Sequence, residues 1–272
     1  MTETLNIAVL GADGRMGQAV ISALSGFKNL KLVCALTHAQ NPRLGQDAQE
    51  LAGVYGRDER ILLKTDFNQA HECDVVIDFS APSATLEFVK GLQDSSPKAI
   101  VSGTTGFTDA QNKDLRRYSN EIALLQSGNF SLGVNMLAAL VEIAADKLRK
   151  DWDIDVLEMH HRHKVDAPSG TALMLGEAAA RGREVELKAV QKLSREGQTG
   201  ARPEGEIGFA TLRGGGVIGE HSVMIASELE MLTLSHSAFD RSVFANGAIQ
   251  AAIWAAEQKP GHYDMKDMLG LA

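Results

Sequence analysis

The stretch "LNIAVLGADGRMGQAV" (residues 5–20) limits the possible folds more than any other part of this chain. An apolar, β-type run is followed at once by Gly11, Gly14 and Gly17, and then by a helical pattern. In a dinucleotide-binding loop, the first glycine allows a tight turn, the second lets backbone amides approach a diphosphate, and the third lets helix and strand pack closely. Because the loop directly follows the first strand, which is the context that the motif requires, dinucleotide binding is favoured over a purely structural turn.

The rest of the first half alternates between strand-like and helix-like patterns. Helices are predicted to begin at Arg15, at Pro82 and near Thr108. Pro82 fits this position because proline is well tolerated in a first helical turn. The remaining Val/Ile/Leu-rich runs are 30–36, 74–80, 99–103 and 122–128, and 37–57 is expected to be a loop. Nearly continuous apolar strands that alternate with helices predict a parallel sheet covered on both faces.

The second half follows a different pattern. A helix over about 132–150 precedes the strand-like run 153–160, and a further helix ends at Arg181-Gly182, where glycine suits the position just past a helix. Three strand-like runs with short connections follow at 207–213, 219–227 and 230–239, which predicts a mixed or mostly antiparallel sheet. The boundary between two domains is expected near Phe130. The pattern alone leaves open where the last helix, about 242–258, packs.

Charge and composition restrict the classes of function. The formal net charge is −8, which argues against a general binder of nucleic acid or anionic membranes. We predict a cytoplasmic protein, because the N-terminal segment lacks a basic region and a long apolar run, and no stretch approaches the roughly 20 apolar residues of a membrane span. Cys34 and Cys73 fit buried, reduced thiols and not a metal-binding pair.

The glycine motif lacks one expected part. A carboxylate should lie at the end of the second strand, where it holds the adenosine ribose. This chain has Thr37 and His38 there. Without that carboxylate a 2′-phosphate is not repelled, and Arg15 or His38 is available to help hold it. The sequence therefore favours tolerance of NADPH beside NADH.

A second cluster, "EMHHRHKVDAPSGTA" (158–172), gathers histidines, a lysine and acids before a predicted helix start. Three interpretations compete: a metal site, a solvated loop, and a proton donor beside an anion site. Adjacent histidines in an extended segment point apart, and no second Cys/His cluster completes a metal site. Pro168 and Ser169 mark a helix start, so the amides of Gly170 and Thr171 are predicted to face an anion.

Residues of this cluster also fit proton transfer. In the preceding strand, period-two alternation puts Glu158 and His160 on one face, so the carboxylate is positioned to orient the imidazole. Lys164 adds a full charge for a substrate carboxylate. Together with a dinucleotide site, the cluster predicts a reductase that combines hydride from nicotinamide with a proton from the protein.

The residues carry a resemblance that covers nearly the whole chain. The segment "LEMHHRHKVDAPSGTA" resembles the hallmark of the 4-hydroxy-tetrahydrodipicolinate (dihydrodipicolinate) reductase family of bacterial lysine and diaminopimelate synthesis. The similarity extends to "GADGRMG", "DVVIDFSAP", "SGTTGF", "SGNFSLGVN", "SREGQTGARPEGEIGFATLRGG", "GEHSVMIAS" and "FANGAI".

The resemblance implies a fold and an assembly. A Rossmann domain would comprise residues 1–130 with 241–272, and an α+β domain with a mixed sheet, 131–240, would bind substrate and build a homotetramer. The implied reaction is NADH- or NADPH-dependent reduction of a cyclic dicarboxylate, 4-hydroxy-tetrahydrodipicolinate or dihydrodipicolinate, to tetrahydrodipicolinate.

The resemblance also implies roles for single residues. His160 would be the general acid, Lys164 would donate a proton and bind a substrate carboxylate, and His161 would touch substrate. Gly170 and Thr171 would hold a carboxylate. The cofactor would lie against the glycine loop and residues near the nicotinamide and the domain hinge: Gly11, Ala12, Asp13, Gly14, Arg15, Met16, Thr37, His38, Gly103, Thr104, Thr105, Ser127, Gly128, Asn129 and Phe130. No metal is implied.

Three further points stay open at this stage. The family commonly has an acidic residue where this chain has Thr37 and His38, so the choice between NADH and NADPH is undecided. Arg213 either belongs to a hairpin connection or makes a second anion contact, and His221 is expected to be structural. A dinucleotide-sensing regulator and a metal hydrolase are the alternatives from other classes of protein.

Overall fold

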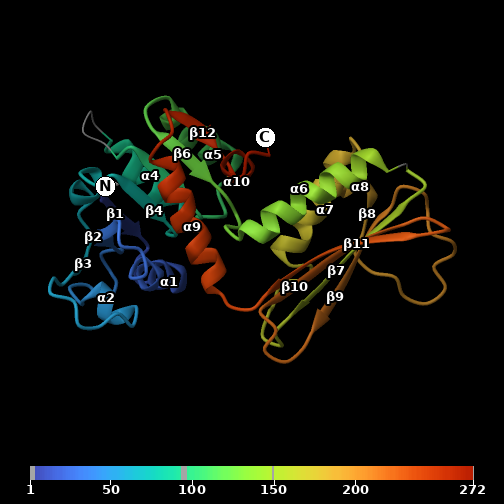
Figure 1. Ribbon diagram of the computed structural model, residues 1–272, viewed down its shortest axis with the longest axis horizontal. Coiled ribbons are helices and arrows are strands. Elements are labelled where there is room, and N and C mark those ends of the chain that lie inside the picture. The colour runs from blue at the N-terminus through green and yellow to red at the C-terminus, as the bar shows by residue number, and fades with distance from the viewer. Residues whose placement is uncertain (1–3, 93–96, 149, 272) are drawn as a thin grey trace. The chain divides into compact units, whose positions relative to one another are not determined.

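The computed structural model describes residues 4–92, 97–148 and 150–271. The chain divides into two compact units, one made of Met1–Ser131 with Ser242–Ala272 and the other of Leu132–Arg241. The first unit is therefore discontinuous in sequence, and the last long helix belongs to it. Figure 1 traces both units from the blue N-terminus to the red C-terminus.

The first unit contains a seven-stranded sheet in the order β12-β6-β5-β4-β1-β2-β3, with every neighbouring pair parallel. Its strands are β1 (Leu5–Leu10), β2 (Leu30–Leu36), β3 (Leu63–Lys64), β4 (Val75–Asp78), β5 (Ala99–Ser102), β6 (Ala123–Gln126) and β12 (Gly261–Tyr263). Apart from β12, this is the 3-2-1-4-5-6 order of dinucleotide-binding folds, which reverses direction beside β1 and places ligands at that switch point.

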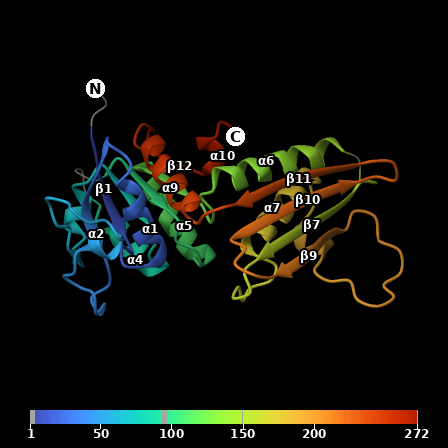
Figure 2. The ribbon, with the colours of Figure 1, turned by 60° about the horizontal axis from the view of Figure 1, so that its bottom comes forward.

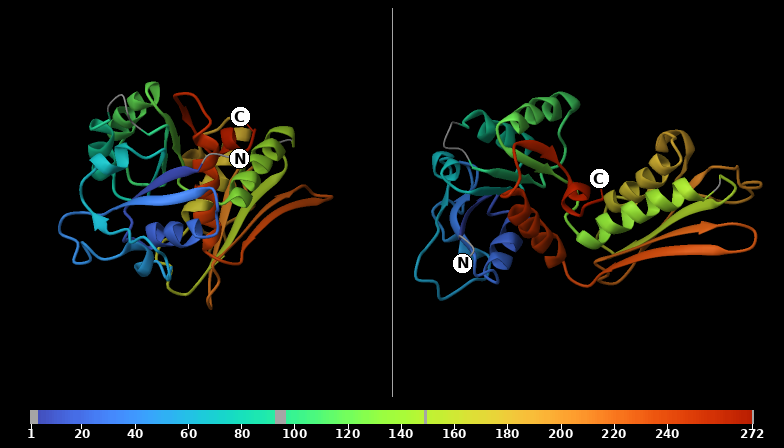
Figure 3. Two further views of the ribbon diagram at one scale, coloured as in Figure 1. Left: turned by 60° about the vertical axis from the view of Figure 1, so that its left-hand side comes forward. Right: turned by 45° about the horizontal axis from the view of Figure 1, so that its top comes forward.

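Helices cover both faces of this sheet (Figure 3). On one face α1 (Arg15–Leu24) contacts α9 (Ser242–Ala255), and on the other α4 (Pro82–Lys90) contacts α5 (Asp109–Arg117). Strand residues such as Leu10 and Ile100 pack with Phe88 of α4 in one apolar cluster. The short elements are α2 (Ala48–Leu51), α3 (Asn68–His71), η1 (Tyr118–Asn120) and α10 (Met265–Met268). Burial of both faces explains why the strands are nearly continuously apolar.

The second unit is a five-stranded mixed sheet in the order β11-β10-β7-β9-β8. Its strands are β7 (Asp153–His160), β8 (Gln191–Lys192), β9 (Ile207–Arg213), β10 (Gly219–Ala226) and β11 (Met231–Ala238). The β7–β9 and β8–β9 pairs are parallel, and β10 is antiparallel to both its neighbours. The predicted pairing of an α/β sheet with a mixed second sheet is confirmed.

Two long helices pack on one face of this second sheet (Figure 2). They are α6 (Leu132–Lys147) and α7 (Gly170–Gly182), followed by the short α8 (Leu187–Val190). Ile154, Val156 and Phe209 point from the strands into the core that the helices close. This packing fixes β7 and the start of α7, which flank and partly contain the 158–172 cluster of histidines, lysine and acids.

Several local features differ from the sequence predictions. The segment expected to be a loop contains α2. No element was expected at β3, α3, α8, β8, β12 and α10, because four-residue helices and strands of two or three residues leave little periodicity. Gly182 is the last helical residue of α7, and the left-handed residue after it is Glu184 (φ 55°). A Cβ at Gly182 would lie 2.3 Å from the carbonyl oxygen of Glu142, so this glycine permits close packing of α7 on α6.

The two cysteines are buried and unpaired. Burial raises the pKa of the Cys34 thiol to about 11 and that of the Cys73 thiol to about 12, so both are protonated at neutral pH and chemically inert. Within the described ranges, no helix is both long and apolar enough to cross a membrane.

Candidate active site

The glycine loop between β1 and α1 is built around close backbone approaches. Gly11 has a positive φ of 72°, and a Cβ there would lie 2.5 Å from the carbonyl oxygen of Phe79. A Cβ at Gly17 would lie 2.2 Å from the carbonyl oxygen of Gly11. Side chains are therefore excluded at both positions. The amides of the first turn of α1 have no partner within the helix and lie next to the glycine loop. These residues fit a dinucleotide diphosphate.

A cavity of about 530 Å³ lies beside this loop, at the carboxyl ends of β1 and β2. The glycine loop contributes Gly11, Asp13 and Gly14, and the end of β2 contributes Thr37 and His38. The remaining lining comes from the segments after β2 and β3, the β4–α4 connection, the first turns of α4 and the ends of β1 and β2: Ala39, Gln40, Thr65, Phe67, Phe79, Ser80, Ala81, Ala84, Glu87, Leu10 and Leu36. The cavity therefore occupies the sheet position where such folds bind a dinucleotide.

The segment predicted to lie near the nicotinamide follows β5. Thr104 donates through Oγ1 to Oδ2 of Asp78 at 3.0 Å and accepts from the amide of Ser80, also at 3.0 Å. Gly103 has no room for a side chain, since a Cβ would lie 2.1 Å from the Phe79 ring. Thr105 is exposed in the connection after Thr104.

Asp78 organises this edge of the sheet, and the sequence analysis did not single it out. Its carboxylate is fully buried and accepts hydrogen bonds from Ser80, Thr85, Ser102 and Thr104. An acidic residue that ends an otherwise apolar buried strand, in "DVVIDFS", was the available signal. The carboxylate ties the connections after β4 and β5 together.

The predicted 127–130 segment follows β6 at the same edge. The hydroxyl of Ser127 donates to the carbonyl oxygen of Asn129 at 2.7 Å, and the Ser127 amide donates to Ser102 at 3.1 Å. Phe130 is buried, with its ring edge-on to Phe79 at a centroid distance of 5.6 Å. Gly128 has open space where a Cβ would be.

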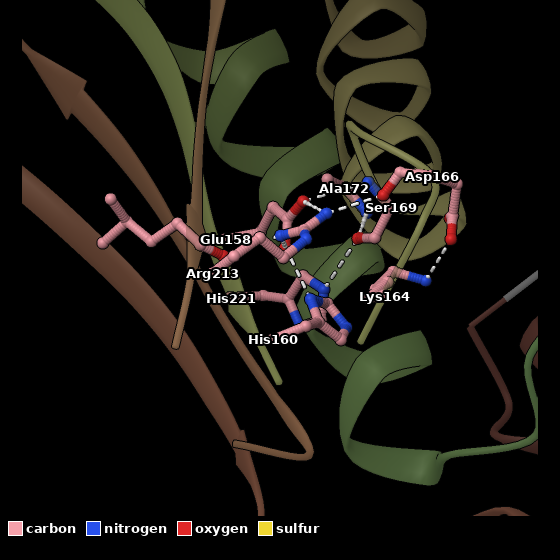
Figure 4. A network of polar contacts seen from close by, with 9 residues as sticks. Glu158, His160, Lys164, Asp166, Ser169, Ala172, Arg213 and His221 are labelled. Atoms are coloured by element: carbon pink, nitrogen blue, oxygen red, sulfur yellow. Dashed lines mark hydrogen bonds and ion pairs between the residues drawn. The ribbon is translucent and has the colours of Figure 1, made fainter. Parts of the chain in front are cut away.

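The second cluster lies in the other unit, on the buried face of β7. The residues of β7 alternate between partly exposed and buried, and Glu158 and His160 share the buried face with Ile154 and Val156. Nδ1 of His160 lies 2.5 Å from Oε2 of Glu158 (Figure 4). An ionised carboxylate can only accept, so Nδ1 carries hydrogen and Nε2 is the ring nitrogen left for chemistry.

Strand register brings two further side chains to this pair. Arg213 of β9 lies opposite His160, and His221 of β10 lies opposite Glu158. The Arg213 guanidinium donates to both oxygens of Glu158 at 2.9 Å and to the carbonyl oxygen of Asp166 at 2.6 Å. Arg213 thus binds Glu158, which was predicted neither by the hairpin interpretation nor by the anion-contact interpretation of this residue. The contact depends on the pairing of β9 with β7, which no local sequence pattern reveals.

The ionisation states in this network follow from burial and hydrogen bonds. Burial opposes ionisation of Glu158, but hydrogen bonds from Arg213 and His160 outweigh it and lower the pKa of this carboxyl. Burial, reinforced by the nearby His160, lowers the pKa of His221 to about 4. Near neutral pH, therefore, Glu158 is charged and His221 is neutral.

The start of α7 lies against the same network. Ser169 is its N-cap, with Oγ accepting from the amide of Ala172 at 3.1 Å, and its own amide donates to Glu158 Oε1 at 3.1 Å. Oγ of Ser169 also lies 3.2 Å from Nε2 of His221. Gly170 opens the helix, and its Cβ position faces open space. The predicted helix start and its cap are confirmed.

The other predicted residues of this segment lie before α7 and in its first turn. Lys164 forms an ion pair with Asp166, with Nζ 2.8 Å from Oδ1, and Thr171 is in the first turn of α7. His161 follows β7, and desolvation together with the neighbouring charge of Arg241 lowers its pKa. Asp166 was not predicted, and a lysine two residues before an acid was the only signal. Among the described residues, no three His, Cys, Asp or Glu side chains come together as a metal site.

The comparison with family models assigns both halves of the chain. Residues 5–130 match the model described as dihydrodipicolinate reductase, N-terminus, and residues 133–269 match that described as dihydrodipicolinate reductase, C-terminus. The chain belongs to the dihydrodipicolinate reductase family. It is an oxidoreductase of that family. Its curated relatives align with it over nearly their full lengths.

Curated relatives carry the name 4-hydroxy-tetrahydrodipicolinate reductase. The protein from Sinorhizobium medicae (strain WSM419) is 52% identical over 273 aligned positions, covering 100% of both chains. The protein from Brucella abortus (strain 2308) is 49% identical and covers 98% of this chain and 99% of its own. The family assignment therefore does not depend on a shared fragment.

Solved structures agree on the fold. A dipicolinate-bound dihydrodipicolinate reductase from Paenisporosarcina sp. TG-14 superposes with a TM-score of 0.77 at 24% identity, covering 97% of this chain and 99% of its own. An amine dehydrogenase from Mycobacterium smegmatis reaches a TM-score of 0.61 at 14% identity, covering 96% and 95%. Both superpositions report a shared fold.

Proposed function

We propose that this chain reduces 4-hydroxy-tetrahydrodipicolinate, or the dihydrodipicolinate that forms when it loses water, to tetrahydrodipicolinate in lysine and diaminopimelate synthesis. The single observation that carries the proposal is the pairing of a complete glycine loop with the Glu158–His160 pair in one chain of this family. The substrate assignment rests on relatives named for that reaction and on a neighbour that holds dipicolinate.

The first unit would bind NADH or NADPH. Support comes from the excluded side chains at Gly11 and Gly17 and from the adjoining cavity of about 530 Å³. When bound, the reduced nicotinamide would supply a hydride. The residues proposed for it at the edge of the sheet are Gly103, Thr104, Thr105 and the 127–130 segment, which Asp78 and Phe79 hold in place through hydrogen bonds and ring packing.

The second unit would supply the proton. The carboxylate of Glu158 holds Nδ1–H of His160, which leaves Nε2 to carry the transferable proton. A Cβ at Gly219 would lie 3.3 Å from Nε2, so this glycine keeps the space beside that nitrogen open. Addition of hydride to a conjugated imine leaves negative charge on the ring system, and a proton from His160 would balance it.

Substrate carboxylates would bind where α7 begins. The helix supplies partial positive charge and the first-turn amides of Gly170 and Thr171, while Lys164 adds a full positive charge. Lys164 is paired with the exposed Asp166, so an incoming carboxylate would compete with that partner. His161 would contact substrate from the end of β7, and protonated Lys164 would be a second source of protons.

We further propose a cytoplasmic homotetramer. The free, buried thiols suit a reducing compartment. The sheet face opposite the helices carries Leu157, Met159, Leu212, Met224 and Met231, and Met231 is 62% exposed. Copies that associate through this face would bury it. Light scattering coupled to gel filtration tests the assembly, and a monomeric mass at micromolar concentration would contradict it.

The activity itself is tested by a coupled assay. The substrate is generated in place by the preceding synthase, and oxidation of NADH or NADPH is followed by absorbance after the purified chain is added. We expect oxidation that requires both the synthase product and this chain. Absence of oxidation with either nucleotide would contradict the proposed function.

A further inference from the structure

The sequence lacks a carboxylate at the end of β2, but the structure brings one there from another segment. Oγ1 of Thr37, the residue that follows β2, donates to Oδ1 of Asp13 in the glycine loop at 2.5 Å. Nδ2 of Asn41 in turn donates to Oγ1 of Thr37 at 2.7 Å. Thr37 and Asn41 are 9% and 7% exposed, so the chain of hydrogen bonds that holds Asp13 is itself largely out of water.

The second oxygen of Asp13 is available. Across the described residues, no donor lies within hydrogen-bonding distance of Oδ2, and Asp13 lines the cavity beside the glycine loop. A carboxylate that lines a ligand space and is anchored through one oxygen can accept hydrogen bonds from vicinal hydroxyls with the other. The adenosine ribose of a dinucleotide presents such a pair.

The charges around the cavity favour a ribose without a phosphate. Among the residues that the structure describes, the ionisable ones that line it are Asp13, Glu87 and His38, and no lysine or arginine is part of the lining. A 2′-phosphate carries about two negative charges and is normally recognised by an arginine or lysine. Arg15, the nearest arginine in sequence, is exposed and is not part of the lining.

We propose that Asp13 binds the adenosine ribose hydroxyls through Oδ2 and selects NADH over NADPH. This inference rests on the proposed function, since it assumes that a nicotinamide dinucleotide occupies this cavity. Asp13 performs from the glycine loop the task that the missing acid at the end of β2 performs in other dinucleotide-binding folds. It reverses the tolerance of NADPH that the sequence alone favoured.

The experiment measures dissociation constants by calorimetry for NADH and NADPH with the wild-type chain and with Asp13→Asn. We expect the wild-type chain to bind NADH at least about tenfold more tightly than NADPH. Asp13→Asn should weaken NADH binding by roughly tenfold, because charge-assisted hydrogen bonds are lost, and should leave NADPH unchanged or tighter, because repulsion is removed. Glu257→Gln, an exposed acid outside the cavity lining, is the matched control, and it should change the ratio of the two constants by less than about twofold.

Two additions make the test independent of folding and of the proposed function. Thr37→Val keeps the Asp13 charge but removes its anchor, and it should reduce the preference for NADH by about three- to tenfold. Equal binding of both nucleotides by the wild-type chain, or an unchanged ratio in Asp13→Asn and Thr37→Val, would overturn the role of Asp13 alone. If the wild-type chain bound neither nucleotide, the proposed function would fail together with this inference.

Discussion

Nδ1 of His160 lies 2.5 Å from Oε2 of Glu158, a carboxylate that is only 1% exposed. The same carboxylate is held by Arg213 and by the amide of Ser169. The two oxygens of Glu158 are therefore held by groups from β7, from β9 and from the N-cap of α7. The proposed proton donor is oriented by a network and not by a single contact.

Replacing the histidine tests the role of the donor directly. His160→Gln should lower kcat by roughly 10²- to 10⁴-fold, because a general acid is removed. The affinity for the dinucleotide should stay nearly unchanged, since the glycine loop is intact. Steady-state kinetics and a binding titration measure the two effects, and a loss of kcat smaller than about threefold would remove His160 from its role.

Glu158 is predicted to be a positioning residue. Glu158→Gln keeps the shape of the side chain but removes the charge, so we expect kcat to fall by about 10- to 100-fold with little change in the dissociation constant of NADH. Arg213 would lose its ionic partner, which should also lower the free energy of unfolding by about 3 kcal/mol. Glu177→Gln, on the exposed face of α7, is the control and should change neither quantity.

The ion pair of Lys164 leads to a paired prediction. Lys164→Ala should raise KM for the substrate by about tenfold or more and lower kcat, because a charge-assisted contact to a carboxylate is lost. Asp166→Asn removes only the competing partner, 2.8 Å from Nζ, and should leave KM within about threefold or lower it. If Lys164→Ala changed only nucleotide binding, the lysine would belong to the other site.

Stability should depend on pH through His221. Its pKa is lowered from 6.5 to about 4 in the folded protein, so the unfolded chain takes up a proton at a higher pH than the folded one. The contribution of His221 to the free energy of unfolding should therefore fall by about 2 kcal/mol between pH 7 and pH 5. Denaturant titrations at both values should show a smaller fall for His221→Asn. Protonation of Glu158, whose pKa is lowered, changes the free energy of unfolding only below about pH 4.5, which is outside the range compared.

Gly17 offers a test of the glycine loop. A Cβ at this position would lie 2.2 Å from the carbonyl oxygen of Gly11, so Gly17→Ala should cost about 2–4 kcal/mol of stability and weaken nucleotide binding. Gly216→Ala is the matched control, because its Cβ would meet nothing within 4 Å. Thermal unfolding compares the two variants, and equal midpoints would contradict the packing argument.

The sequence was a good guide where one residue pattern determines one element. The bounds of β1, β2, β7 and β9 follow from apolar runs, the start of α4 follows from Pro82, and the Ser169 cap follows from local turn chemistry. The face shared by Glu158 and His160 follows from the two-residue period of a strand.

Contacts that depend on the order of strands in a sheet could not be predicted from the sequence pattern. Arg213 meets Glu158 only because β9 pairs with β7, and Asp13 meets Thr37 only because β1 pairs with β2. Asp78 was likewise missed, since its partners come from β5 and α4 as well as from its own connection. Contacts of this kind are determined by how distant strands pair, and the residue pattern of a single segment carries no information about that pairing.

The central claim is that this chain transfers hydride from a reduced nicotinamide to the carbon from which the 4-hydroxyl group leaves. The decisive measurement supplies NADH deuterated at nicotinamide C4 and analyses the product by NMR and mass spectrometry. We predict one deuterium at ring C4 of tetrahydrodipicolinate when the transferred position is labelled, and none when only the opposite face is labelled. A product without deuterium from either labelled form would contradict the account.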